Sequence, residues 1–401
     1  MLNEHQLPIR PERMPGRSAL RVGTALGMLL SVVASASVGL AKGQPTRRVP
    51  AARHSQFLCT SDGLQLFRIS ENGTLKPVAY SAADDLPLPQ TDDISQILPD
   101  SQGRSLYVSW AMTYNQGAAI AAEVDRMRVS RRGKLVSVSH QAFPLDSSGA
   151  GLRPLALAGQ GRLLLVVFKS GQIGKIFLHA YRVQPYGPLR SASKPVILRN
   201  DFQSITVDPT GNNVYIIYTH DSRIYHYSVL PNAVLSPFDV VSAPTVKQPT
   251  TITFHPSRRF AYVTSQGENS VALYREGSNG KLSFSADYHL DDTKINHTFA
   301  PTAVITPNGR FLYVSSPRGY TFQYRILSDG RVQPLMPKAI HCGGYKMVVD
   351  LTGRFAYSLS NTTGTNIIYQ YRIQSDGTLR PLVPRFISKI GTQGSVTIVQ
   401  N

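Results

Sequence analysis

Short apolar runs separated by polar turns fill the chain beyond Ala51, and no stretch there shows the apolar spacing of an amphipathic helix. Runs such as Ala303-Val304-Ile305 and Met347-Val348-Val349 are each followed by a polar turn and then by a second apolar run. This pattern is typical of antiparallel strands joined by tight turns. The sequence therefore predicts an all-β protein.

One of these turns recurs in six copies along the chain. The clearest copies are residues 307–314 (PNGRFLYV), 351–358 (LTGRFAYS), 256–263 (PSRRFAYV) and 209–216 (PTGNNVYI). Weaker copies are residues 102–108 (QGRSLYV) and 160–166 (QGRLLLV). Because an apolar run precedes and follows each copy, its polar centre is interpreted as a hairpin turn between the first two strands of a unit.

A second turn follows each first one, usually as Asn-Gly or Asp-Gly between alternating apolar residues. Its last residue is Gly73, Gly133, Gly187, Ala233, Gly280, Gly330 or Gly377. Asn-Gly and Asp-Gly favour type I′ hairpins, in which both central residues need a positive φ. The mean step is about 51 residues, which suits four-stranded propeller blades with longer loops.

The two ends of the repeat region complement each other. Residues 55–81 begin at a second strand and lack an innermost one, whereas residues 394–399 (GSVTIV) have the pattern of an innermost strand with nothing after it. Together they make one blade. The predicted fold is a seven-bladed β-propeller of four-stranded blades, closed by N-terminal strands pairing with the C-terminal strand, which leaves no exposed sheet edge.

The first 54 residues are set apart from this fold. Four arginines precede an uncharged stretch over residues 22–41 that ends in small residues, as in a secretory signal. We expect residues 1–41 to be a signal peptide, with an uncleaved N-terminal anchor as the alternative, and residues 42–54 to be a basic linker before the propeller domain of residues 55–401. Translation from Met14 instead of Met1 would give a signal of ordinary length.

The chain carries 42 Lys and Arg against 24 Asp and Glu, a net charge of +18 that falls to +16 without residues 1–41. Export predicts an extracytoplasmic protein, periplasmic or secreted. Together with the absence of long Lys/Arg runs, it argues against nucleic acid as a partner. We expect a monomer that binds a small polar or acidic ligand or an acidic envelope polymer, with membrane contact only if the N-terminal segment is uncleaved.

The paired turns and the runs Tyr262-Val263-Thr264-Ser265 and Tyr313-Val314-Ser315-Ser316 resemble the YVTN-type repeat of the lactonase family of seven-bladed propellers, which includes 6-phosphogluconolactonases. The resemblance covers the chain from Ser55 onward. It implies an active site at the mouth of the central channel, with His, Arg and Glu side chains. The innermost strands of the second to fourth blades bring no histidine there, and Gln266 stands where the family often has glutamate.

Blade topology separates the charged residues by face. Strand 1–2 turns fall on the face away from the mouth, so their arginines, and Asp208 and His255 beside them, are interpreted as structural. Crossovers and strand 2–3 loops fall on the other face, the usual ligand face of a propeller. The crossovers supply Asp92, Asp93, Arg153, Asp201, Lys247, His297, His341, Tyr345 and Lys346. The loops supply Trp110, Tyr114, Lys169, His220, Asp221, Arg223, Glu268, Arg318 and Tyr320.

Two functions remain open on these residues. One is a binding or scaffold propeller whose ligand contacts Asp201, His220, Asp221, Arg223, Glu268 and Tyr345. The other is a lactone hydrolase, a carboxylic ester hydrolase, with His297, His341, Arg153 and Arg318 as its catalytic residues. No cofactor is expected, and no metal, because the histidines show no metal-ligand spacing.

The chain has two cysteines, Cys59 and Cys342, both on the predicted ligand face. A disulfide between them would tie the N-terminal strands to the sixth blade in an oxidising compartment. Two free cysteines buried as small apolar side chains are the alternative. The sequence leaves both open.

Overall fold

The structure is a computed structural model, in which the propeller lies within the compact unit Ser31–Asn401. The structure describes residues 55–61, 64–78, 93–114, 118–130, 133–144, 151–169, 174–185, 187–218, 220, 222–242, 246–290, 301–316, 319–342, 344–361, 366–390 and 396–401. The predicted signal and linker lie outside these residues. Among the described residues, no helix is long and apolar enough to cross a membrane.

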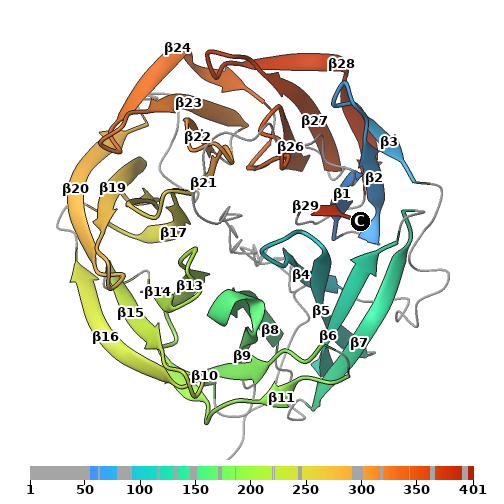
Figure 1. The fold of residues 1–401 in the computed structure, drawn as a ribbon, viewed down its shortest axis with the longest axis vertical. Helices are drawn as coiled ribbons and strands as arrows, with labels where there is room; N and C mark the ends of the chain where they lie inside the picture. Colours follow the sequence, from blue (N-terminus) through green and yellow to red (C-terminus); the bar gives the residue numbers. More distant parts are fainter. Residues whose placement is uncertain are drawn as a thin grey trace, which may run out of the picture. The chain divides into compact units, whose positions relative to one another are not determined.

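Seven antiparallel sheets form a ring, as predicted (Figure 1). Blade 1 is β4 (Asp93–Pro99), β5 (Ser105–Tyr114), β6 (Ala118–Val129) and β7 (Leu135–Pro144). Blade 2 is β8 (Gly151–Ala158), β9 (Leu163–Lys169), β10 (Ile176–Arg182), β11 (Arg190–Ser191) and β12 (Val196–Leu198), with the 3-10 turn η3 (Gly159–Gly161) after β8. Blade 3 is β13 (Phe202–Val207), β14 (Asn213–Tyr218), β15 (Arg223–Val229) and β16 (Leu235–Ser242).

The later blades repeat the same order. Blade 4 is β17 (Pro249–Phe254), β18 (Phe260–Ser265), β19 (Ser270–Glu276) and β20 (Leu282–His289). Blade 5 is β21 (Thr302–Ile305), β22 (Phe311–Ser315), β23 (Tyr320–Ile326) and β24 (Val332–His341). Blade 6 is β25 (Lys346–Val349), β26 (Phe355–Asn361), β27 (Asn366–Ile373) and β28 (Leu379–Ile390). Blade 2 departs from the prediction, because its outer strand is split into β11 and β12, which both pair with β10.

Blade 7 closes the ring in the predicted way. It combines β1 (Gln56–Thr60), β2 (Leu66–Ile69) and β3 (Leu75–Pro77) with β29 (Val396–Gln400) from the C-terminus. β29 is the innermost strand and pairs antiparallel with β1, Leu58 opposite Ile398. Figure 1 shows the two ends of the propeller side by side in this blade. The pairing covers an edge of β1 that would otherwise be open to aggregation.

The strand 3–4 turns lie where predicted, but their type is different. All seven final residues have a positive φ, including the non-glycine Ala233 at 69°. In the five turns whose preceding residue is described (Asn72, Asn232, Asn279, Asp329 and Asp376), that residue has no positive φ, so these are type I turns followed by one left-handed residue, not type I′ turns. In blade 7, the Asn72 side chain accepts a hydrogen bond from the Thr74 amide, which explains the preference for Asn or Asp before the glycine.

The recurring pattern of the repeat is explained by contacts between neighbouring blades. The tyrosine of each clear copy donates a hydrogen bond to the carbonyl of the next blade's turn glycine: Tyr215 to Gly280, Tyr262 to Gly330, Tyr313 to Gly377 and Tyr357 to Gly73. In three copies the preceding Phe ring packs on the same glycine and is covered by two arginines. Arg310 and Arg325, for example, stack on Phe311. These turn arginines therefore have the structural role that their position predicted.

The two cysteines are free and buried, and they lie in different cores. Cys59 packs between blades 7 and 1 with Phe57 and Val108, whereas Cys342 packs between blades 5 and 6 with Tyr313 and Met347. The disulfide is therefore excluded in this fold. Burial raises the pKa of the Cys59 thiol to about 12, so it stays protonated at neutral pH.

Candidate functional site

The ligand face is built by the strand 2–3 loops and by the crossovers that feed the innermost strands. Side chains and backbone at this level link successive inner strands. The Ser204 hydroxyl donates to the Thr250 carbonyl at 2.9 Å, and the Thr302 hydroxyl donates to the Tyr345 carbonyl at 3.1 Å. These bonds, one buried and one partly buried, hold inner strands of neighbouring blades at a fixed spacing below the loops.

Blade 3 brings two of the predicted ligand-binding residues together. The Asp201 carboxylate accepts a bidentate pair of hydrogen bonds from the guanidinium of Arg199, at 3.0 and 2.9 Å. His220 Nδ1 lies 3.9 Å from the same carboxylate. Arg199 also stacks on the Tyr218 ring, 5.1 Å from its centroid, and Tyr218 pairs with the predicted Arg223 across β14 and β15. The Asp201 charge is thus neutralised locally, and His220 and Arg223 beside it are exposed.

Blade 4 contributes an ion pair at the same level. Lys247 Nζ lies 2.8 Å from the Glu268 carboxylate, and this contact raises the pKa of Lys247 through the hydrogen bond and the opposite charge. The Ser265 hydroxyl donates to the Lys247 carbonyl. Glu268, predicted as a ligand contact, therefore has a cation as its partner.

His341 lies on the rim and not in a crossover. It is the last residue of β24, the outermost strand of blade 5, and it pairs with Tyr320, whose ring centroid lies 5.1 Å away in an edge contact. Its imidazole is exposed, and its carbonyl accepts a hydrogen bond from Arg385. The candidates His220 and His341 are consequently on different blades, 3 and 5.

Lys346 is the buried cation of this face. It is the first residue of β25 and is 4 % exposed, and it is the only Lys or Arg in the buried class among the described residues. Side chains alternate along a strand, so Lys346 shares its side with Val348, which packs into the apolar layer between blades 6 and 7. Burial lowers the pKa of its amine to about 7. Sequence reasoning placed Lys346 on this face but had no signal for its burial, which depends on the neighbouring blade.

Several of the other predicted site residues lie outside the part of the chain that the structure describes. His297, Asp221 and Arg318 lie outside the described residues, and of Arg153, in β8, only the backbone is described. Tyr345 precedes β25, and burial raises the pKa of its hydroxyl, which stays protonated at neutral pH. The catalytic roles of His297, His341, Arg153 and Arg318 stay predictions.

The fold and this face can be compared with known proteins. A family model described as "Lactonase, 7-bladed beta-propeller" matches residues 201–386, from the start of blade 3 into β28, the last strand of blade 6. The chain is a lactonase-family seven-bladed β-propeller. The chain is 26 % identical over 242 residues to the 6-phosphogluconolactonase of Pectobacterium carotovorum. The aligned stretch covers 58 % of this chain and 69 % of the relative.

Other similar proteins fit the same family. The 6-phosphogluconolactonase of Pectobacterium atrosepticum is 28 % identical over 242 residues, again 58 % of this chain and 69 % of the relative. A solved periplasmic gluconolactonase of Pseudomonas aeruginosa superposes with a TM-score of 0.67 at 17 % identity, covering 86 % of this chain and 99 % of that one. At that identity the likeness supports the propeller fold. None of these comparisons assigns a role to a residue of this lactonase-type propeller.

Proposed function

We propose that the protein is a lactone hydrolase that opens the ring ester of a sugar-type lactone at the ligand face. The observation that carries the proposal is the lactonase family match over residues 201–386, the blades that contribute Asp201, His220, Glu268, His341 and Lys346 to that face. The named relatives are 6-phosphogluconolactonases and a gluconolactonase. A binding or scaffold role has no such support from the comparisons.

Lys346 has the chemistry of the general base in this proposal. An amine with a pKa of about 7 is substantially neutral at neutral pH and has a lone pair to accept a proton. It takes a proton from water as the water oxygen attacks the lactone carbonyl carbon. The tetrahedral intermediate then breaks its bond to the ring oxygen, which leaves as an alkoxide and takes the proton back from the ammonium group. The product is the open hydroxy acid.

The surrounding residues fit a polyhydroxylated substrate. The protonated hydroxyl of Tyr345 is a donor for the developing oxyanion, and the exposed His220 and Arg223 on blade 3 offer donors to hydroxyl or acid groups. Arg153 and Arg318 are expected to hold an acid group of the substrate. The predicted signal segment and the periplasmic gluconolactonase neighbour favour an extracytoplasmic enzyme.

The test is lactone hydrolysis by purified protein, followed by proton release in weak buffer with gluconolactone and with aliphatic lactones. Lys346→Met should lower kcat by roughly 10²- to 10⁴-fold, the usual contribution of a general base. Lys281→Met is the matched control, because Lys281 lies exposed in the strand 3–4 turn of blade 4, on the opposite face. Turnover no faster than buffer across the panel would contradict the proposal.

A further inference from the structure

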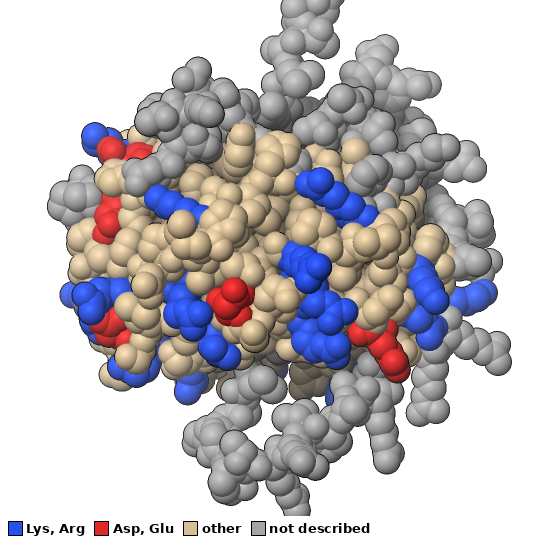
Figure 2. All heavy atoms as spheres, turned by 90° about the horizontal axis from the view of Figure 1, so that it is seen from above, with Lys and Arg blue, Asp and Glu red and all other residues tan. Residues whose placement is uncertain are grey.

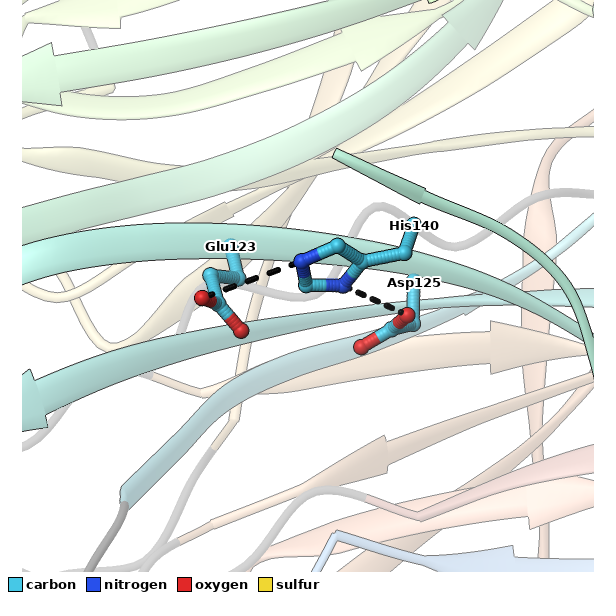
Figure 3. Close-up of side chains that lie close together, drawn as sticks. All are labelled: Glu123, Asp125 and His140. Atoms are coloured by element: carbon cyan, nitrogen blue, oxygen red, sulfur yellow. Dashed lines mark hydrogen bonds and ion pairs between the residues drawn. The ribbon is translucent and has the colours of Figure 1, made fainter. Parts of the chain in front are cut away.

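A cluster of metal-ligating side chains lies on the outer half of blade 1, away from the site described above. Glu123 and Asp125 come from β6 and His140 from β7 (Figure 3). Asp125 and His140 are directly opposite each other in the β6–β7 pairing, and Glu123 lies two residues along the same strand. Side chains two apart on a strand share a face, so the register places all three on one face of the sheet.

The three side chains of the cluster lie close to one another. His140 Nδ1 lies 3.1 Å from an Asp125 carboxylate oxygen, and Nε2 lies 3.8 Å from an oxygen of Glu123. One donor atom from each residue can be chosen so that all lie within 4.8 Å of one another. Ligands 2.0–2.1 Å from a tetrahedral zinc ion are about 3.3 Å apart. Nδ1 of His140 and the Asp125 carboxylate already have this spacing. Because a metal ion binds only one nitrogen of the ring, Glu123 has to turn its long side chain from Nε2 towards Nδ1.

Burial and charge make the cluster a good receptor for a cation. The two carboxylates are largely buried, with side chains 15 % and 10 % exposed, whereas His140 is 52 % exposed. Two carboxylates and an imidazole are all side chains that bind divalent transition-metal ions. The chain as a whole has a net charge of +18, so these two neighbouring carboxylates are not part of a generally acidic surface. Solvent at the His140 side can supply a fourth ligand.

We propose that Glu123, Asp125 and His140 bind a divalent transition-metal ion of the Zn²⁺ type. The imidazole favours Zn²⁺ and Co²⁺ over Ca²⁺ and Mg²⁺, which prefer oxygen ligands. A bound ion links the two outer strands of blade 1 and leaves one position for water. The site does not depend on the lactonase activity, and its residues were not grouped by the sequence analysis, which expected no metal.

The experiment measures Zn²⁺ binding to tag-free protein by calorimetry at pH 7.5, and Co²⁺ binding by its visible absorption. We expect one saturable site whose affinity falls at least about tenfold in Glu123→Gln and in His140→Gln, since each removes a ligand. His289→Gln is the matched control, because His289 is also exposed on an outermost strand but forms no ion pair with a carboxylate among the described residues.

Two outcomes would overturn the proposal. One is the absence of saturable Zn²⁺ or Co²⁺ binding to the wild-type protein, which would leave His140 as a hydrogen-bond partner of the carboxylates. The other is binding that His140→Gln leaves unchanged, which would place the metal elsewhere on the surface. Asp125 is buried, so its variants are avoided, and unchanged melting temperatures without metal would show that the Glu123 and His140 variants are folded.

Discussion

Replacing Lys346 by methionine should make the protein more stable, by an amount that depends on pH. Methionine has about the same length as the lysine stem and no charge, so it can occupy the buried position of Lys346 without a desolvated amine. The pKa of Lys346 is lowered from 10.5 to about 7. At about 1.36 kcal/mol per pKa unit, a protonated Lys346 costs the folded state on the order of 5 kcal/mol relative to an exposed lysine.

The sign of the pH dependence follows from proton counting. Between pH 7 and 10.5 the unfolded chain holds a proton on Lys346 that the folded protein has lost, so the unfolding free energy of the wild type rises with pH. Below pH 7 both states are protonated and the penalty is complete. The advantage of Lys346→Met should therefore be greatest at pH 6 and decline steadily towards pH 10.

Guanidinium denaturation of both proteins at pH 6, 8 and 10, followed by tyrosine fluorescence, measures this difference. Taking the difference between variant and wild type removes the contribution of every other titrating group. Lys281→Met, an exposed control, should change stability by less than about 1 kcal/mol at each pH. A Lys346→Met difference that does not vary with pH, or a loss of stability at pH 6, would refute the account of a buried, desolvated amine.

Three further predictions concern the ring itself. Gly377→Ala should lower the unfolding free energy by about 1–3 kcal/mol more than Gly187→Ala does. Both glycines have a positive φ, but only a Cβ added at Gly377 would collide with a ring, that of Phe311. Equal losses in thermal or chemical unfolding would contradict the inter-blade packing. Tyr313→Phe should lower the unfolding free energy by about 1–2 kcal/mol through loss of the hydrogen bond to the Gly377 carbonyl, and a neutral result would remove that bond from the account. Deleting residues 394–401 should lower the melting temperature and promote aggregation, because β29 covers β1; an unchanged melting curve and a monomeric elution profile would argue against closure by β29.

The ring was predictable from sequence because its signals are local. A left-handed residue in each turn usually requires a glycine, which is visible in the sequence, and the matching position of Ala233 was found from spacing alone. The turn type was not predictable from Asn-Gly, since the same dipeptide serves type I′ turns and type I turns with a left-handed glycine. The disulfide was undecided because face and strand assignments do not say which inter-blade layer a cysteine enters.

The site was less accessible to sequence reasoning. Its residues come from different blades, and their environment is set by contacts across the ring. Lys346 resembles any other charged residue after a crossover until the packing of blade 7 shows that it is buried. The group of Glu123, Asp125 and His140 depends on the β6–β7 register, which the intervening turn fixes. The positive charge, by contrast, is visible in composition, and Figure 2 shows Lys and Arg outnumbering acidic residues over the surface in view.

The most direct test of the proposed lactone hydrolase is the pH profile of kcat/KM for gluconolactone, corrected for spontaneous hydrolysis, in the wild type and in Lys346→Met. The account predicts turnover whose kcat/KM rises with an apparent pKa near 7, as the base loses its proton, and a variant that is folded but has lost this limb of the profile. Hydrolysis no faster than buffer would contradict the lactonase, and full activity with the same profile in Lys346→Met would contradict Lys346 as its base.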